Sequence, residues 1–216
     1  MRVIDLSHAI ETGMPLYPGT PAPEFHLLSN IVQDGFAERI LVLSSHAGTH
    51  VDLPSHILDG GETLDDFPAE RFIGPGLVLE LRGTPGGVIS VEMLEPFRQK
   101  IMACEFLLFR SGWDRYWGTP GYYAAYPVLS PEAALWLAGF SLKGVGVDAV
   151  SVDPPEAGGF PVHARLLQSG IIIVENLAGL DSIPDSPFIF CCLPLKMTGA
   201  EASPVRAVAL VEEGAR

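Results

Sequence analysis

Between Ser45 and His56 the chain reads SHAGTHVDLPSH, and this stretch holds three of the six histidines of the sequence. His46, His50 and Asp52 carry imidazole and carboxylate groups, the ligands that divalent zinc, manganese and iron accept. A single histidine in a polar loop more often makes ordinary hydrogen bonds, but a cluster of three with an aspartate favours a metal. The stretch therefore predicts a metal-binding and catalytic segment.

The spacing of these residues excludes a straight strand as their scaffold. At roughly 3.3 Å per residue, an extended chain would separate His46 from Asp52 by about 20 Å, whereas two ligands of one metal lie about 3 Å apart. Gly48 can provide the required turn, and the Thr49 hydroxyl can bind the backbone freed by it. A helix is disfavoured by the strand-like run before the motif and by Pro54 after it. We expect a loop.

His56 lies four residues after Asp52, beyond the rigid ring of Pro54. This spacing predicts a position close to the metal without requiring a bond to it. An imidazole with an ordinary pKa of about 6.5 can accept a proton from activated water near neutral pH. We expect His56 to be the general base, and the alternatives are a fifth ligand or a residue that orients a ligand.

Outward from this segment, glycines and prolines separate short apolar runs along the whole chain. Runs of this kind, bounded by turn-forming residues, predict strands. They occupy residues 40–43, 77–81, 106–109, 171–174 and 188–193. With no internal repeat or low-complexity tract, the sequence predicts a single strand-rich α/β domain over residues 1–216.

Helix signals are fewer than strand signals. Ser90 can cap a segment with apolar residues on one face, and Ser130 followed by Pro131 combines a cap with a first-turn proline. A third helix is expected over residues 162–168, ending before Gly170. His163 lies in this helix and Glu175 ends the strand-like run that follows it. A helix running out and a strand running back would return both residues to one end of the fold, although taken alone such residues are more often structural.

Composition narrows the classes of partner. The 216 residues include 26 acidic and 13 basic side chains, which gives a formal net charge of −13 and disfavours nucleic acid and anionic membranes. A small-molecule substrate is expected. The three cysteines lack paired spacing, which favours a reducing compartment, and Asp5 and His8 interrupt any signal-peptide core. We expect a cytoplasmic protein without membrane contact.

The segment from His46 to His56 resembles the His-x-Gly-Thr-His-x-Asp-x-Pro-x-His signature of the cyclase family, which includes bacterial kynurenine formamidases and isatin hydrolases. Further similar segments cover nearly the whole chain: IDLSH at 4–8, GMPLYPG at 13–19, GVDAVSVDP at 146–154, ENL at 175–177 and ASPVRA at 202–207. The resemblance implies a swivelling β/β/α fold and a homodimer, in which a partner chain sometimes contributes to the wall of the active site.

The resemblance also implies roles for individual residues. His46, His50 and Asp52 would bind a first metal, and in members with two zinc ions Asp52 bridges to a second ion held by His163 and Glu175. Other members use a single manganese. We expect zinc, as one or two ions, with manganese as the alternative. The ligand types by themselves do not rank the metals, because histidine and carboxylate suit zinc, manganese and iron alike.

The family role of His56 is catalytic acid and base, and it agrees with the chemistry of the residues. A metal lowers the pKa of bound water from 15.7 toward about 7 and polarises a carbonyl, while a histidine takes a proton and returns it to the leaving nitrogen. This is amide hydrolysis. Ser44, Ser45 and Ser55 lack the Gly-x-Ser-x-Gly context of a nucleophile and are expected to be structural.

Two segments are candidates for the substrate pocket. The rigid loop around Tyr17, Pro18 and Gly19 is expected to cover an apolar or aromatic substrate. A second aromatic cluster comprises Trp113, Tyr116 and Trp117. Its role is left open between packing, a dimer contact and a wall of the pocket. Asp148, Ser151 and Asp153 are expected to support the pocket.

The leading hypothesis is a metal-dependent hydrolase that cleaves a C–N amide bond of a small aromatic or cyclic substrate. Kynurenine formamidases have a second histidine where this chain has Ala164, and a tryptophan where it has Tyr17, so the resemblance does not assign N-formylkynurenine. A lyase or cyclase/dehydratase that uses the same metal is an alternative. A metal- or ligand-binding protein without turnover is another, against which the presence of His56 argues.

Overall fold

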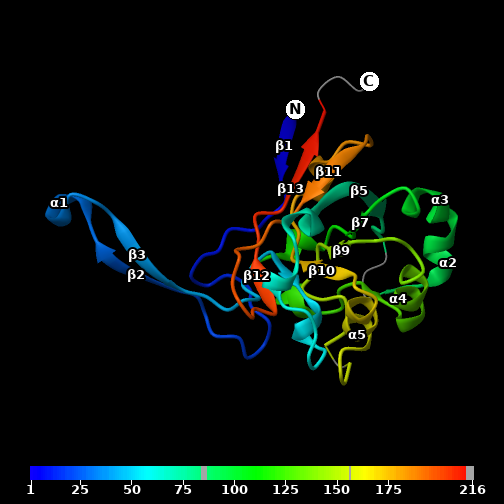
Figure 1. Cartoon of the computed structure of the whole chain (residues 1–216), viewed down its shortest axis with the longest axis horizontal. Coiled ribbons are helices and arrows are strands. Elements are labelled where there is room, and N and C mark those ends of the chain that lie inside the picture. The colour runs from blue at the N-terminus through cyan, green and yellow to red at the C-terminus, as the bar shows by residue number, and fades with distance from the viewer. Residues whose placement is uncertain (84–86, 156, 213–216) are drawn as a thin grey trace.

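Strands from distant parts of the sequence meet in one sheet. The computed structural model describes residues 1–83, 87–155 and 157–212, and within these ranges nine strands form a mixed sheet in the order β1-β13-β11-β5-β7-β9-β10-β4-β12 (Figure 1). In chain order these strands are β1 (Arg2–Asp5), β4 (His50–Asp52), β5 (Ile73–Glu80), β7 (Phe106–Arg110), β9 (Gly144–Val147), β10 (Ile172–Glu175), β11 (Phe188–Cys191), β12 (Ala202–Pro204) and β13 (Val208–Val211). The predicted α/β class is confirmed.

The centre of the sheet is parallel and buried on both faces. Strands β5, β7, β9 and β10 run parallel, as expected for strands that read as continuous apolar runs. In β7, Phe106 and Leu108 enter one core cluster, whereas Leu107 and Phe109 enter the other. Four of the five predicted runs therefore form β5, β7, β10 and β11, each within a few residues of the predicted bounds.

Short helices contribute to the core cluster on one face of the sheet. They are α2 (Val91–Leu94), α3 (Arg98–Ile101), α4 (Pro131–Leu137) and α5 (Pro161–Gln168). As predicted, the Ser130 hydroxyl caps α4 by accepting a 3.0 Å hydrogen bond from the backbone of Ala133. The helix expected after Ser90 is divided in two by a 3₁₀ turn containing Pro96, because proline removes a helical hydrogen bond and clashes with the preceding turn.

On the other face of the sheet, outer strands pack against central strands of the same sheet. Ile4 in β1 and Ala209 in β13 belong to the same buried cluster as Leu108 and Val174 from the central strands. Across this cluster the rings of Phe106 and Phe190 lie 5.1 Å apart. The sheet therefore curls, so that two layers of strands and one layer of helices stack on one another. The strands β10 and β4, which carry the site, lie toward one end of this curled sheet.

A hairpin projects from the body of the protein (Figure 1). It consists of β2 (Glu24–Ser29), the short helix α1 (Ile31–Asp34) and β3 (Glu38–Val42). The run predicted at residues 40–43 thus overlaps a strand, but one that lies outside the main sheet. A second small pair joins β6 (Val88–Ile89) to β8 (Val128–Leu129). Among the described residues, no helix is long and apolar enough to cross a membrane.

Candidate metal centre

The histidine motif divides into a turn and a strand. Gly48 has φ +67°, in the left-handed region that glycine favours, and it supplies the expected turn. The Thr49 hydroxyl fixes this turn by donating a 2.6 Å hydrogen bond to the backbone oxygen of Asn176. The prediction of a loop is wrong for His50 to Asp52, which form β4, because β10 and β12 provide hydrogen-bonding partners on both sides.

Sheet pairing and helix packing bring the distant ligand-type residues to the motif. The register of β4 and β10 places His50 opposite Glu175, and their Nε2 and Oε2 atoms lie 3.6 Å apart. His163 on α5 points to the same place, with Nε2 at 3.2 Å from Oε1 of Glu175. All three side chains are buried. Residues more than one hundred positions apart thus form one cluster.

Asp52 lies at the centre of this cluster and is fully buried. Its Oδ1 atom is 2.9 Å from Nδ1 of His46 and 3.3 Å from Nε2 of His50, and its Oδ2 atom is 3.7 Å from Nε2 of His163. Neither oxygen meets the geometry of a hydrogen bond to any described group. A buried carboxylate without such partners requires a compensating positive charge.

Hydrogen bonds set which nitrogen of each buried histidine faces Asp52. His50 Nδ1 lies 2.9 Å from the backbone oxygen of Gly48, and His163 Nδ1 lies 2.7 Å from Oδ2 of Asp153. If each Nδ1 carries the donated proton, the Nε2 lone pairs face the carboxylates of Asp52 and Glu175. Lone pairs on nitrogen would then face lone pairs on the carboxylate oxygens. This arrangement is stable only if a cation or additional protons lie between them.

The pKa values of His50 and Asp52 also reflect the need for positive charge in this cluster. Burial favours the neutral form of His50, but the carboxylates of Asp52 and Glu175 outweigh it and raise the pKa of His50 to about 9. Burial also favours neutral Asp52, yet His50, His163 and His46 hold the pKa of this carboxyl well below its usual range. In the absence of a metal, protons on the imidazoles supply the positive charge.

Two overlapping groups of residues could hold a divalent ion, and both include Asp52. In each group the ligand atoms lie within 4.8 Å of one another: His46, His50 and Asp52 form one group, and Asp52, His163 and Glu175 form the other. Tetrahedral zinc with bonds of about 2.0–2.1 Å separates its ligand atoms by roughly 3.3 Å. The donor set and its spacing fit one or two such ions.

A cavity of about 170 Å³ opens onto the cluster. Its apolar lining residues are Pro15, Leu16, Tyr17, Val150 and Phe160, and the rest of its lining is polar and includes four histidines and Glu175. Pro18 and Gly19, expected to contact substrate, do not line it. A hydrogen bond from the backbone of Thr20 to Tyr17 O closes a turn that leaves Pro18 and Gly19 exposed at its tip.

His56 ends the 3₁₀ turn Pro54–His56 and lines the same cavity. Its ring centroid lies 4.3 Å from that of His46 and 5.9 Å from that of His163. Burial lowers the pKa of His56 below its ordinary value, against the opposing effect of Asp52. The ring therefore lies beside both candidate ion positions and favours its neutral form.

Two residues of the site were not given a role by the sequence. Glu201 Oε1 lies 3.4 Å from Nε2 of His46 and accepts a 2.6 Å hydrogen bond from Ser45. Asn176 lines the cavity, has φ +57°, and donates from Nδ2 to the oxygen of Gly48. Glu201 adjoins the family-like segment 202–207 and Asn176 lies within the family-like segment 175–177, and these positions were the available signal.

The aromatic cluster packs inside the protein. Trp113 is buried and donates from its indole nitrogen to the backbone oxygen of Tyr122, and Tyr116 and Trp117 pack around the same cluster. None of the three predicted aromatic residues lines the cavity at the histidines. Within the chain, these three residues pack against one another and do not form a wall of this cavity.

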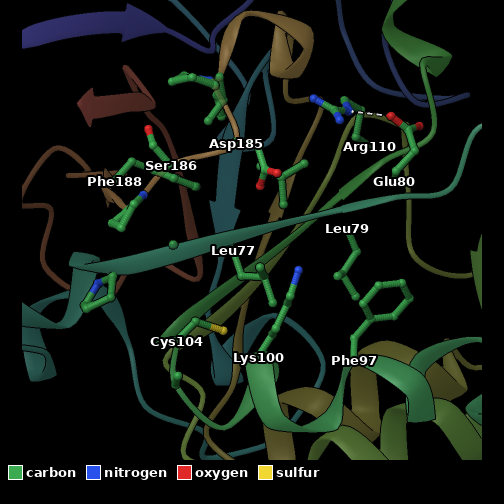
Figure 2. A pocket seen from close by; sticks show the side chains of 17 residues that line it. Leu77, Leu79, Glu80, Phe97, Lys100, Cys104, Arg110, Asp185, Ser186 and Phe188 are labelled. Carbon is green, nitrogen blue, oxygen red and sulfur yellow. Dashed lines mark hydrogen bonds and ion pairs between the residues drawn. The ribbon is translucent and has the colours of Figure 1, made fainter. Parts of the chain in front are cut away.

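A larger cavity, of about 630 Å³, lies elsewhere, between β5, α3 and the loop before β11. Figure 2 shows Leu77, Phe97 and Lys100 lining it, with the Arg110–Glu80 ion pair at one side. It contains no histidine and shares no lining residue with the smaller cavity. It is larger than the cavity at the histidines, but both groups of described residues that could hold a metal ion lie at the smaller cavity.

His8, close to the metal centre, predicts a pH-dependent stability. Its ring stacks on Trp117 at 3.8 Å, and burial lowers the pKa of His8 to about 4 against a smaller effect of Asp114. The unfolded chain therefore binds more protons below about pH 6.5, so the contribution of neutral His8 is complete above that pH and declines toward pH 4. Because the ring is partly exposed, we expect a loss of ~1–2 kcal/mol.

Urea unfolding at pH 7 and pH 5 measures this contribution. His8→Phe keeps the stacking on Trp117 and removes the titrating group. The wild-type protein should lose more unfolding free energy between the two pH values than the variant does. Equal losses in the two proteins would show that His8 is not responsible.

The model of the cyclase family matches residues 4–154, about two thirds of the chain. The chain belongs to the cyclase family. The resemblance inferred from the motif is thereby confirmed. A kynurenine formamidase of Salinibacter ruber is 31% identical over 214 residues, covering 96% of this chain and 97% of that protein. An isatin hydrolase of Roseibium aggregatum is 30% identical over 216 residues, covering 89% of this chain and 82% of that protein.

Solved structures of cyclase-family proteins share the fold. The crystal structure of an isatin hydrolase bound to the product analogue thioisatinate aligns with a TM-score of 0.87 and 26% identity, covering 98% of this chain and 92% of the other. A protein described as a predicted metal-dependent hydrolase from Bacillus stearothermophilus aligns with a TM-score of 0.80 and 27% identity, covering 96% and 97%. The curled sheet is therefore the family fold.

Proposed function

We propose that the protein is a metal-dependent hydrolase that cleaves a C–N amide bond of a small, aromatic or cyclic substrate. The observation that carries this proposal is the buried Asp52 carboxylate, which is surrounded by imidazole nitrogens at 2.9–3.7 Å and accepts no hydrogen bond from the described residues. The relatives named kynurenine formamidase and isatin hydrolase support the same class of reaction.

His46, His50 and Asp52 hold the first ion, and Asp52, His163 and Glu175 hold the second where two are bound. The two ligand groups that share Asp52 support this assignment. Zinc is the proposed metal and manganese the alternative, because nitrogen and oxygen ligands at this spacing suit both. When bound, the metal lowers the pKa of water and polarises the amide carbonyl.

His56 acts as the general base and acid. Its imidazole takes a proton from the attacking water and returns it to the nitrogen of the broken bond, so that the carbonyl carbon gains OH and the nitrogen gains H. Its position in the cavity beside His46 and His163 supports this role, and among the described residues no side chain hydrogen-bonds to its ring. Tyr17 forms part of the wall of the substrate cavity, and the small volume of this cavity fits a compact substrate.

Metal analysis combined with an isotope experiment tests the function. The purified protein is loaded with zinc or manganese, its metal content is measured, and N-formylkynurenine, isatin and related small amides are screened in water enriched in ¹⁸O. Hydrolysis incorporates one solvent oxygen into the new carboxylate. Turnover without ¹⁸O in the product would indicate a lyase, and metal binding without turnover of any amide would contradict the proposed activity.

We also propose that the chain acts as one domain in a cytoplasmic homodimer. Pairing of β1 with β13 joins the two ends of the chain within one sheet, which supports one domain over residues 1–216. The cysteines of the described chain are all free, which supports a reducing compartment. Size-exclusion chromatography with light scattering measures the assembly.

A further inference from the structure

Asn176 directly follows Glu175 and is buried, although it belongs to neither group of residues that could hold a metal ion. Its backbone nitrogen donates to the oxygen of Ala149 at 2.9 Å, and its backbone oxygen accepts from the Thr49 hydroxyl at 2.6 Å. Its φ of +57° lies in the left-handed region, which asparagine adopts more readily than most residues. The surroundings of Asn176 therefore fix its backbone, and its amide is fixed separately.

Tyr122 determines which way this amide points. Tyr122 is fully buried, and its hydroxyl donates a 2.6 Å hydrogen bond to Oδ1 of Asn176. Burial raises the pKa of Tyr122 well above its usual range, so the hydroxyl keeps the proton that it donates. Because Oδ1 accepts this bond, Nδ2 is turned toward the backbone oxygen of Gly48, at 3.0 Å. Reversal of the amide would place Oδ1 against the Gly48 oxygen.

The oxygen of Gly48 connects the amide to the metal centre. This oxygen can only accept, and two nitrogens bind it: Nδ2 of Asn176 at 3.0 Å and Nδ1 of His50 at 2.9 Å. Both nitrogens must therefore donate, which places a hydrogen on Nδ1 of His50. The 3.5 Å contact between the two nitrogens then joins two donors. With Nδ1 occupied in this way, His50 offers Nε2 to Asp52 at 3.3 Å.

Tyr122 is held in place by the aromatic cluster and not by the cavity. It belongs to the 3₁₀ turn Pro120–Tyr123, and its backbone oxygen accepts a 2.9 Å hydrogen bond from the indole nitrogen of Trp113. Its ring centroid lies 5.1 Å from that of Trp117. Tyr122 does not line the cavity at the histidines. A hydrogen-bond chain therefore runs from a packed aromatic residue through Asn176 and the Gly48 oxygen to His50.

His50 depends on such support more than His163 does. Nδ1 of His163 is held directly by the Asp153 carboxylate at 2.7 Å, and the backbone of α5 donates to both oxygens of that carboxylate. Nδ1 of His50 has a backbone oxygen of the turn at Gly48 instead. A peptide group that adjoins glycine can rotate at low cost unless another group binds it. The Asn176 amide is the described side chain that binds this oxygen.

We propose that Asn176 and Tyr122 are positioning residues for the metal ligand His50. Tyr122 orients the amide of Asn176. The amide fixes the Gly48 oxygen, and this oxygen holds the imidazole with Nε2 toward the ion. The inference rests on the proposed function in one respect, the role of His50 as a ligand. Groups behind a metal-bound histidine set its orientation and its basicity, and their loss typically costs roughly 10–100-fold in metal affinity.

The zinc affinity of Asn176→Gly tests the role of the amide. Glycine adopts the left-handed region without strain and keeps the two backbone bonds, so only the side chain is removed. Ala125→Gly is the matched control, because Ala125 has the same φ of +57° and is exposed. Competition with a chromophoric chelator measures the affinity for each zinc ion that binds. Asn176→Gly should bind one zinc ion at least about 10-fold more weakly than the wild-type protein, and the control should bind as the wild type does.

Tyr122→Phe tests whether the hydroxyl acts through Asn176. The variant keeps the ring and removes one bond of the chain, so zinc should bind about 3-fold more weakly. In the double variant Tyr122→Phe/Asn176→Gly the hydroxyl has no amide to orient. Its zinc affinity should therefore equal that of Asn176→Gly alone. Two effects that multiply in the double variant would contradict the proposed chain.

Urea unfolding separates positioning from a general loss of stability. Ser130→Ala removes the buried cap of α4, so its unfolding midpoint should fall while its zinc affinity stays at the wild-type level. Zinc affinity is measured without substrate, so the result does not depend on amide hydrolysis. Wild-type affinity in Asn176→Gly would overturn this inference alone. A wild-type protein that binds no zinc would overturn it together with the proposed metal centre.

Discussion

Asp52→Asn is expected to remove metal binding and to lower kcat/KM at least about 1,000-fold. Asp52 belongs to both groups of residues that can hold an ion, and its two oxygens are buried without a hydrogen bond from the described residues. The amide removes the negative charge and places N–H donors where a cation should be bound. Loss of several kcal/mol of transition-state stabilisation by the metal corresponds to about three orders of magnitude in rate.

Metal content after zinc loading and dialysis is the decisive measurement for Asp52. Asp59→Asn is the matched control, because Asp59 is exposed and belongs to neither ligand group. The control should retain the metal and the activity. An Asp52→Asn protein with wild-type metal content would show that this carboxylate does not bind the ion, whatever its activity.

His56→Ala should keep the metal and lose at least about 100-fold in kcat. The ring lines the cavity beside both candidate ion positions, and a positioned acid/base contributes roughly 10²–10⁴-fold to proton transfer. Because His56 belongs to neither ligand group, metal content should remain at the wild-type level. Single-turnover kinetics on metal-loaded protein separates a slower chemical step from weaker binding.

His26→Ala controls for the loss of a histidine, since His26 is exposed on β2 and pairs only with Glu24 in the described structure. This control should turn over substrate as the wild-type protein does. Turnover of His56→Ala near the control rate would contradict the role of base. Loss of metal together with activity would instead identify His56 as a ligand, the alternative that its spacing left open.

The buried strands were the part of the fold that local sequence could predict. The run at 106–109 forms β7 because a strand covered on both faces must be apolar at every position, and that pattern is visible without the structure. The run at 40–43 looks similar, yet β3 is exposed. A run of apolar residues reports that burial is needed, but not which surface provides it.

In the site, too, local sequence predicted one part and distant residues decided the other. The turn at Gly48 followed from the distance that a shared metal imposes on His46 and Asp52, whereas β4 depends on hydrogen bonds from β10 and β12, which are far away in the sequence. Glu201 was missed for the same reason. Its contact with His46 arises only when β12 pairs beside β4.

By itself, the sequence determined the local chemistry of this protein: a histidine and aspartate motif with a glycine turn, apolar runs that must be buried, and membership of the cyclase family. The tertiary structure alone decided which groups meet. Pairing of β4 with β10 and packing of α5 bring Glu175 and His163 to Asp52. Local patterns follow from the geometry of neighbouring residues, whereas these contacts depend on strand register and helix packing across the whole fold.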